Sequence, residues 1–387
     1  MRNTIQWALG LGILLAAPVR PVPADIFERN ARLARGVNFG NVLEAPKEGD
    51  WGLTLKEEYF KLVADAGFKS VRIPIKWSNH AAATAPYAID AAFLARIDWA
   101  VAQSLKNGLA PVINIHHYDE MNTDPANHKA RWLALWKQIA EHFQDQGPDV
   151  YFELLNEPNS SLTMALWNQY LLEGLAMIRS SNPARAVVVG PSDWNGIWRL
   201  KDLALPADDR NLIVTVHFYE PFHFTHQGAD WAEGSAAWLG TKWGSQADQD
   251  AVAKTLKDAK DWGAAKQRPI FMGEFGSYSK ADMASRVLWT RFVARTAEKN
   301  GFSWAYWEFG SGFGVYDPAA SQWRPDLKDA LLGDPMGIRK QSGKLGRAVG
   351  RRMILDGAGM PGAGVMVAGA KGEWTDLRGR PVSVGCP

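Results

Sequence analysis

The stretch DVYFELLNEP, residues 149–158, decides the fold. It begins as an apolar run of the kind that forms a strand buried on both faces. It ends in polar residues, with Asn156 and Glu157 followed by Pro158. A carboxylate at the end of a buried strand is costly unless it is paired or used. The stretch therefore predicts a strand with functional side chains at its tip, ended by Pro158 because proline cannot donate to the ladder.

Segments with the pattern of strands and helices alternate on both sides of this stretch. The strand-like segments are nearly continuous apolar runs, and the segments between them place apolar residues at helical spacing. The expected strands are 36–41, 70–75, 110–117, 149–158, 186–191, 211–219, 268–276 and 302–309. The expected helices are 54–66, 91–107, one with Trp132, Leu135, Trp136, Ile139 and Phe143 on one face, 162–180, 196–204, 247–262, 281–300 and one after Pro325.

Eight strand–helix units within roughly 300 residues fit the (β/α)8 TIM barrel of the α/β class. A doubly wound parallel sheet is the alternative. Such a sheet normally carries the phosphate-binding turn G-x-G-x-x-G after its first strand, and the segment GVNFGN at 36–41 differs from that pattern. The pattern therefore favours the barrel.

The two ends of the chain differ from this alternation. Arg2, the apolar run 5–17 and the small residues before Asp25 are typical of a secretory signal peptide at 1–24, with an uncleaved anchor as the alternative. The run is shorter than the roughly 20 residues that span a bilayer. We expect the barrel at 25–343 and a poorly ordered, Gly-rich tail at 344–387. The predicted protein is secreted, extracellular or periplasmic, and leaves the membrane once the signal is cleaved.

The composition limits the classes of partner. The net charge is only +2, so nothing indicates binding to nucleic acid or to an anionic membrane surface. The single cysteine, Cys386, excludes a disulfide within the chain, so stability comes from the core. The 18 tryptophans suit core packing and also the binding of flat sugar faces. We expect a monomer.

Polar side chains gather where the expected strands end. In a barrel of this kind, the C-terminal ends of all strands meet at one mouth, where active sites lie. Each of these residues alone could be an ordinary loop, core or surface residue, and it is their common placement that favours a site. They are Asn38, Asn41, Glu44, Arg72, His116, His117, Asn156, Glu157, His217, Tyr219, Glu274, Trp307 and Glu308.

Two carboxylates on separate strands suit hydrolysis of a glycosidic bond. Glu157 and Glu274 are expected to face each other across the mouth with about 5 Å between their carboxyl groups, the spacing of a retaining mechanism. A metal site is the first alternative, but His116 and His117 are neighbours on a strand and point to opposite faces. The sequence lacks the metal-binding patterns H-E-x-x-H and C-x-x-C and the serine-nucleophile pattern G-x-S-x-G. A phosphate site is also disfavoured, because Glu274 and Glu308, at the turns after the last two strands, would repel the anion. We expect neither a metal ion nor a cofactor.

Taken together, six motifs resemble those of glycoside hydrolase family 5: R-I-P (72–74), H-H-Y (116–118), N-E-P (156–158), H-x-Y (217–219), G-E-F-G (273–276) and A-Y-W-E-F (305–309). The segment GVNFGNVLEAPKEGDWG, residues 36–52, resembles the opening of bacterial endoglucanases of that family, some of which also cleave mannan. The resemblance covers about residues 28–335. It implies a (β/α)8 barrel and a reaction that retains the anomeric configuration.

The resemblance also implies roles for the strand-end residues. Glu157 would be the acid/base, Glu274 the nucleophile, and Asn156 the partner of the 2-hydroxyl in subsite −1, which holds the sugar that is attacked. Arg72 would keep Glu274 ionised. Further roles are implied as follows: Tyr219 bonds the nucleophile, His217 lies beside the acid, His116 and His117 bind hydroxyls near subsite −1, Trp307 forms its floor, Asn41, Glu44 and Glu308 bind hydroxyls further along the minus side, and His226 and Trp231 contact sugar on the plus side or the rim.

The expected function is that of a secreted endo-β-1,4-glucanase acting on β-glucan or mannan polysaccharide. A β-mannanase or a dual glucanase/mannanase is the nearest alternative, because glucose and mannose differ only in the 2-hydroxyl. A sugar-binding barrel without catalysis, or a scaffold barrel without a ligand, is the alternative from another class. The presence of both carboxylates and of an aromatic mouth argues against these.

Overall fold

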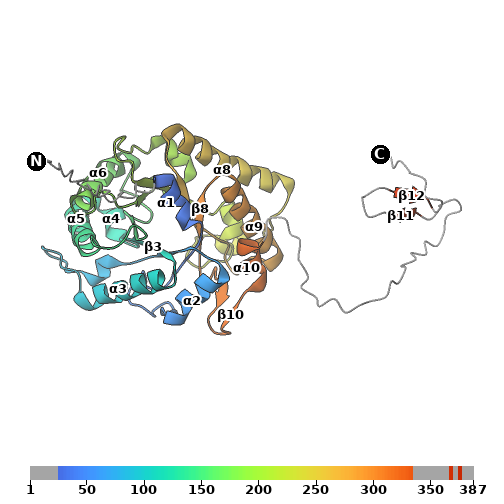
Figure 1. Cartoon of the computed structure of the whole chain (residues 1–387), viewed down its shortest axis with the longest axis horizontal. Helices are drawn as coiled ribbons and strands as arrows, with labels where there is room; N and C mark the ends of the chain where they lie inside the picture. Colours follow the sequence, from blue (N-terminus) through green and yellow to red (C-terminus); the bar gives the residue numbers. More distant parts are fainter. Residues whose placement is uncertain (1–24, 334–365, 369–373, 377–387) are drawn as a thin grey trace, which may run out of the picture. The chain divides into compact units, whose positions relative to one another are not determined.

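The computed structural model describes residues 25–333, 366–368 and 374–376. Within 25–333, eight parallel strands pair in chain order and close into a barrel, with β1 hydrogen-bonded to β8 (Figure 1). The predicted TIM barrel is confirmed, and the doubly wound sheet is wrong. The strands are β1 (Arg35–Asn38), β2 (Ser70–Ile73), β3 (Ala110–Asn114), β4 (Tyr151–Glu153), β5 (Val187–Val189), β6 (Leu212–Phe218), β7 (Ile270–Phe275) and β8 (Ser303–Tyr306).

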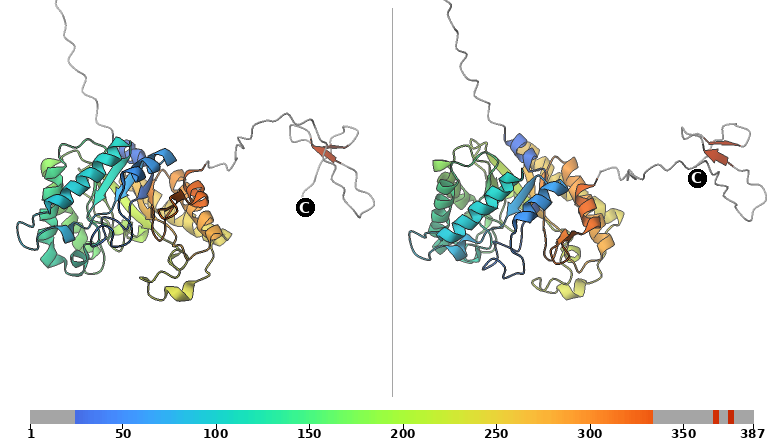
Figure 2. Two further views of the ribbon diagram at one scale, coloured as in Figure 1. Left: turned by 90° about the horizontal axis from the view of Figure 1, so that it is seen from below. Right: turned by 60° about the horizontal axis from the view of Figure 1, so that its bottom comes forward.

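Helices surround the strands (Figure 2). Those that follow the eight strands in turn are α2 (Glu57–Ala66), α3 (Ala91–Lys106), α5 (Pro125–His142), α6 (Met164–Ser181), the 3-10 helix η2 (Ile197–Asp202), α8 (Gln246–Lys266), α9 (Met283–Lys299) and α10 (Pro325–Leu332). Shorter elements lie in the loops: η1 (Trp77–His80), α4 (Asp119–Thr123), α7 (Phe222–Thr225), η3 (Ser235–Trp238), β9 (Tyr316–Asp317) and β10 (Gln322–Trp323). Asp90 caps the start of α3, since its carboxylate accepts from the Phe93 amide at 2.7 Å.

The strands are shorter than the apolar runs that predict them. β4 ends at Glu153, well before Pro158, so proline does not end this strand. The backbone nevertheless keeps its cross-strand bonds for a few residues more, because the Asn156 amide donates to the Ile115 carbonyl at 2.9 Å. In the same way, β8 ends at Tyr306, and Trp307 follows it. Glu157 and Trp307 therefore lie on the first turns beyond their strands, whereas His217 and Glu274 still lie within β6 and β7.

An additional helix, α1 (Ile26–Leu33), closes the opposite end of the barrel, and the sequence analysis did not predict it. It contacts residues at the starts of the strands. The Asn30 side-chain amide donates to the Ile270 carbonyl at 3.1 Å, and the Tyr151 hydroxyl donates to the Arg29 carbonyl at 2.9 Å. With α1 covering this end, the polar residues gather at the opposite end of the barrel.

The predicted signal peptide at 1–24 lies outside the described residues and stays a prediction. The tail at 344–387 lies outside them too, except for β11 (Met366–Ala368) and β12 (Trp374–Asp376), which pair antiparallel. The chain divides into two compact units, Met1–Gly337 and Ile338–Pro387. Of the helices that the structure describes, none has the length and apolarity needed to cross a membrane.

Candidate active site

The two predicted acids meet at the mouth of the barrel. Glu157 lies just beyond β4, and Glu274 lies near the end of β7. One oxygen of each carboxylate and one ring nitrogen of His217 all lie within 4.8 Å of one another. Carboxyl groups about 5–5.5 Å apart are typical of retaining glycosidases, whereas inverting enzymes need room for a water molecule between them. The geometry is that of a pair in which one acid can attack directly.

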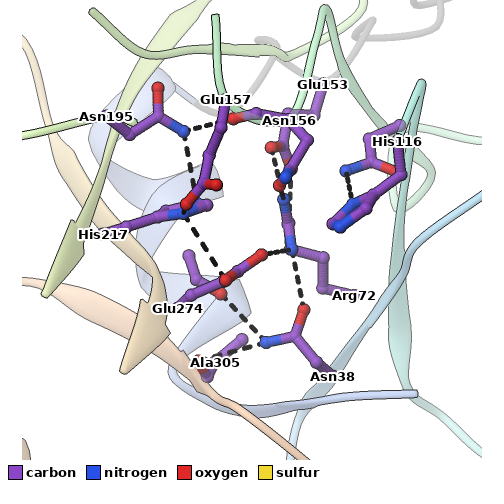
Figure 3. Close-up of polar contacts among 12 residues, drawn as sticks. Asn38, Arg72, His116, Glu153, Asn156, Glu157, Asn195, His217, Glu274 and Ala305 are labelled. Carbon is purple, nitrogen blue, oxygen red and sulfur yellow. Dashed lines mark hydrogen bonds and ion pairs between the residues drawn. The ribbon is translucent and has the colours of Figure 1, made fainter. Parts of the chain in front are cut away.

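Arg72 positions the side chains around this pair of acids (Figure 3). It is fully buried on β2. Its Nε and Nη2 donate to the two oxygens of Glu153 at 2.6 and 2.7 Å, and its Nη1 donates to Glu274 at 2.7 Å. It also donates to the side-chain oxygens of Asn38, at 2.9 Å, and Asn156, at 2.5 Å. A buried guanidinium that is paired this completely fixes the positions of the groups around it.

The nucleophile candidate Glu274 is held on both oxygens. Oε1 accepts from Arg72, and Oε2 accepts from the Tyr219 hydroxyl at 2.8 Å. Burial raises the pKa of Glu274, while His217, Arg72 and the bond from Tyr219 act in the opposite direction. Arg72 was expected to keep Glu274 ionised. It does act to lower this pKa, but burial has the larger effect and the pKa is raised. The expected hydrogen bond from Tyr219 to Glu274 is thus present.

Within the described barrel, residues 25–333, the acid candidate Glu157 is held on one oxygen only. Its Oε1 lies 2.6 Å from Nδ1 of His217, which is itself 3.5 Å from Oε2 of Glu274. Burial raises the pKa of Glu157 to about 7, opposed by Arg72 and reinforced by Glu153. Because Glu274 accepts two hydrogen bonds that favour its charged form, we assign it as the group that ionises first.

A large cavity opens above the two acids. Its volume is about 1150 Å³, above the range of roughly 300–1,000 Å³ that is usual for small-molecule pockets. It is large enough for several sugar units. Of the residues that the sequence singled out, those that line it are Asn41, His116, His117, Asn156, Glu157, His217, Tyr219, His226, Trp231, Glu274 and Trp307.

This arrangement has relatives among known proteins. Residues 34–312 match the family model described as Cellulase (glycosyl hydrolase family 5). The chain belongs to glycoside hydrolase family 5.

Individual relatives agree with this family. The chain is 38% identical over 297 residues to endoglucanase H of Acetivibrio thermocellus, a match over 77% of this chain and 32% of that protein. It is 52% identical to the crystal structure of endoglucanase Cel5A from Thermotoga maritima, with a TM-score of 0.79 over 80% of this chain and 100% of that one. A structure of the same Cel5A with a mannotriose substrate gives 51% identity and the same TM-score over 79% of this chain and 100% of that one. The chain spans about a third of the length of endoglucanase H.

Two predicted sugar-binding residues of this family 5 chain are placed differently from expectation. Glu44 and Glu308 are both fully buried. Glu44 accepts from the main-chain amides of Asn41 and of Val42, the latter at 2.9 Å, while Glu308 accepts from the Asn41 side chain at 3.0 Å. Because backbone and amide donors occupy them, neither carboxylate contacts the cavity directly in this structure. They hold Asn41 at its wall.

The histidines around the mouth are neutral. Burial lowers the pKa of His217, and also that of His117, to about 4, and lowers that of His116 well below its usual value. His116 stacks against Trp307, with their ring planes at 8° and centroids 5.9 Å apart. Burial likewise lowers the pKa of His226 to about 4. Neutral rings can donate to hydroxyls without placing charge beside a sugar.

Several aromatic residues of the cavity went unnoticed in the sequence. Trp194 and Trp198 lie on the loop after β5, with 53% and 59% of their surface exposed. Trp198 lies on Gly196, where an added Cβ would come within 2.5–2.6 Å of three ring carbons. The spacing W-N-G-I-W at the end of an expected strand could have revealed them. The further aromatic residues that line the cavity include Trp51, Phe222, Trp238, Tyr278 and Phe313.

The activity should depend on pH as a bell. If Glu274 is the nucleophile and Glu157 the acid, Glu274 must be ionised and Glu157 protonated at the start of the reaction. In that case kcat/KM rises as Glu274 loses its proton and falls as pH passes the pKa of Glu157, about 7. The two limbs report apparent values of a coupled pair. We expect this profile for cello-oligosaccharides between about pH 4 and 9. A flat profile over that range would contradict the paired-carboxylate mechanism.

Chelation should leave the activity unchanged. Within residues 25–333, one group has the spacing to hold a metal ion, and it consists of Glu157, His217 and Glu274. Oε1 of Glu157, Nδ1 of His217 and both oxygens of Glu274 are already engaged with one another or with Arg72 and Tyr219. We therefore predict full activity after dialysis against EDTA. Loss of activity that zinc restores would assign these three residues to a metal instead.

Proposed function

We propose that this chain is a secreted endo-β-1,4-glucanase that cleaves cellulose and related β-glucans with retention of configuration. The observation that carries the proposal is the acid pair within 4.8 Å, with Glu274 held by Arg72 and Tyr219 and Glu157 held by His217. The endoglucanase names of the relatives support the substrate class. Secretion rests on the sequence of residues 1–24 alone.

The reaction follows from the geometry in two steps. In the first, a Glu274 oxygen attacks the anomeric carbon while Glu157 gives its proton to the leaving glycosidic oxygen, which forms a covalent glycosyl-enzyme. In the second, Glu157 takes a proton from water, and that water displaces Glu274. Asn156, oriented by Arg72, binds the 2-hydroxyl, a contact that strengthens in the transition state.

Cleavage within a chain is supported by the placement of aromatic rings on both sides of the acids. Trp51 and Trp307 lie on the side of the loops after β1 and β8, and Trp194 and Trp198 lie on the side of the loop after β5. The β5 loop adjoins the acid, since the Trp194 amide donates to the Pro158 carbonyl at 3.3 Å. An aromatic contact on each side lets the site hold sugar units before and after the cleaved bond.

Mannan is the second candidate substrate, alone or together with glucan. A relative of 51% identity has been solved with mannotriose, and the same relative with cellobiose. A panel of carboxymethylcellulose, glucomannan and galactomannan, with the products separated by length, tests both. Oligosaccharides of mixed length from carboxymethylcellulose are the expected result. Cleavage of galactomannan alone would assign a mannanase, and no cleavage of any of them would favour a barrel that only binds sugars.

Trp307→Ala should lower catalysis without unfolding the protein. The ring is half-buried, with one face near His116 and its edge over Gly40, so it borders the cavity and lies outside the closed core. Removal of a floor that holds the distorted sugar should reduce kcat/KM on cello-oligosaccharides at least about tenfold, or ~1.4 kcal/mol. The melting temperature should stay within a few degrees. A large drop in melting temperature with kcat/KM preserved would show that Trp307 is a core residue and not a substrate contact.

A further inference from the structure

Asn195 connects the acid to the loop after β5, and no role follows for it from the sequence motifs. It is fully buried, with φ at +55°. Its main-chain carbonyl accepts from the amide of His217 at 3.1 Å. Its side-chain Nδ2 lies within hydrogen-bond distance of the Asn156 carbonyl and 3.2 Å from Nε2 of His217 (Figure 3). Asn195, His217 and Glu157 thus form a chain of three side chains.

The partners of the Asn195 amide determine which way it points. The main-chain oxygen of Asn156 can only accept, so the Asn195 atom beside it must be the NH2 group. The second hydrogen of that group is then directed at Nε2 of His217. The amide oxygen faces Gly190, where an added Cβ would meet it at 2.0 Å. The observed orientation leaves the amide oxygen without a hydrogen-bond partner among the described residues, but a reversed amide would bring it against the Asn156 carbonyl oxygen, which is the greater cost.

A hydrogen bond that the Asn195 side-chain amide donates to Nε2 fixes the tautomer of His217. Nε2 must accept, so the proton of the neutral ring is on Nδ1, 2.6 Å from Oε1 of Glu157. Oε1 is then an acceptor, and the proton that Glu157 transfers must be on Oε2. We propose that Asn195 is a positioning residue that fixes the tautomer of His217 and so keeps the transferable proton of Glu157 on Oε2. This inference rests on the proposed function.

The opposite tautomer would disable the acid. With the proton on Nε2, the lone pair of Nδ1 would face Glu157 and bind the proton that belongs to the leaving group. The charged groups that face this ring are Glu157, Glu274, Arg72 and Glu153, and none of them lies within hydrogen-bond distance of Nε2 among residues 25–333. Burial keeps the ring neutral, with its pKa lowered to about 4. What remains to be determined is which of its two nitrogens carries the proton.

Asn195→Asp tests this with a side chain of the same shape. A carboxylate beside Nε2 draws a proton to that nitrogen, so the ring either adopts the opposite tautomer or becomes charged and holds Glu157 ionised. In both cases the acid loses its transferable proton. We expect kcat/KM for cellotetraose to fall at least about tenfold, and kcat/KM for 2,4-dinitrophenyl cellobioside, whose leaving group needs no proton, to change less than about threefold. Asn195→Ala, which removes the donor and adds no acceptor, should show the same pattern more weakly.

The control is Asn168→Asp, which changes an amide on α6 that donates to the Asp202 carbonyl at 2.9 Å. It should leave the ratio of the two rates unchanged. An equal loss on both substrates in Asn195→Asp would mean that Asn195 only supports the fold, and unchanged rates would also overturn the proposal. If the wild-type protein cleaves neither substrate, the proposed function fails instead.

Nitrogen NMR on histidine-labelled protein reads the tautomer in the wild-type protein itself. The ring of His217 should show a protonated Nδ1 and an unprotonated Nε2 in the wild-type protein near neutral pH. The variants serve only to assign its signal among the eight histidines. A protonated Nε2 in the wild-type protein would overturn the proposal directly, whether or not Asn195→Asp folds.

Discussion

Glu274→Ala should abolish hydrolysis of cello-oligosaccharides and of activated aryl glycosides alike. In the proposed mechanism Glu274 attacks the anomeric carbon, so a better leaving group cannot replace it. Loss of a nucleophile costs on the order of 10⁴-fold or more in kcat. Arg72 keeps its two bonds to Glu153 in the variant, so the fold should survive. The measurement is kcat/KM on both substrates, with the melting temperature recorded on the same preparation.

Rescue by azide would show that the activity is lost because the nucleophile is missing, and not because the protein is misfolded. A small anion fits the space of the missing carboxylate and attacks from the same face, so Glu274→Ala with azide should release a glycosyl azide of inverted configuration. Glu120→Ala, which removes an exposed carboxylate on α4, is the control and should behave as wild type. Activity near the wild-type value in Glu274→Ala would show that another residue is the nucleophile.

Glu157→Gln should separate the two kinds of substrate. The amide keeps the shape of the side chain but carries no transferable proton. General acid catalysis contributes about 10²–10⁴-fold, so kcat/KM on cello-oligosaccharides should fall by an amount in that range. On 2,4-dinitrophenyl cellobioside, kcat/KM should change little, because it reports only the first step and that leaving group departs unprotonated.

The pH profile of Glu157→Gln gives a second check. The falling limb of the bell belongs to the group whose pKa is raised to about 7, and it should disappear when that group is replaced. If the variant lost the same factor on both substrates and kept the falling limb, Glu157 would not be the acid.

The barrel was predictable because its strands are buried on both faces and its helices on one. Continuous apolar runs and helical periodicity record those two environments directly. The ends of the strands were less predictable. Glu157 and Trp307 still belong to apolar runs in the sequence, but the backbone leaves the barrel before them. Hydrophobic pattern reports burial, and the apolar neighbours of these two residues, Leu155 and Phe309, are as buried as the strands.

The hidden parts of the site were not predictable for a different reason. Glu153 is a lone carboxylate within an apolar strand, which signals a buried partner, but that partner is Arg72 on β2, and sequence alone does not pair the two. Glu44 was interpreted as a ligand for sugar because it follows a strand end. The structure shows that backbone amides take up both of its oxygens. Such bonds depend on the path of a loop, which leaves no pattern in the sequence.

The central claim is that Glu274 forms a covalent bond with the sugar during catalysis. A 2-deoxy-2-fluoro-cellobioside with a good leaving group tests it, because the fluorine slows both steps and the leaving group restores only the first. After incubation and proteolysis, mass spectrometry should find one fluorinated disaccharide on the peptide that contains FMGEFG, residues 271–276, attached at Glu274. Attachment at any other residue, or turnover to the α-anomer without a trapped intermediate, would contradict the account.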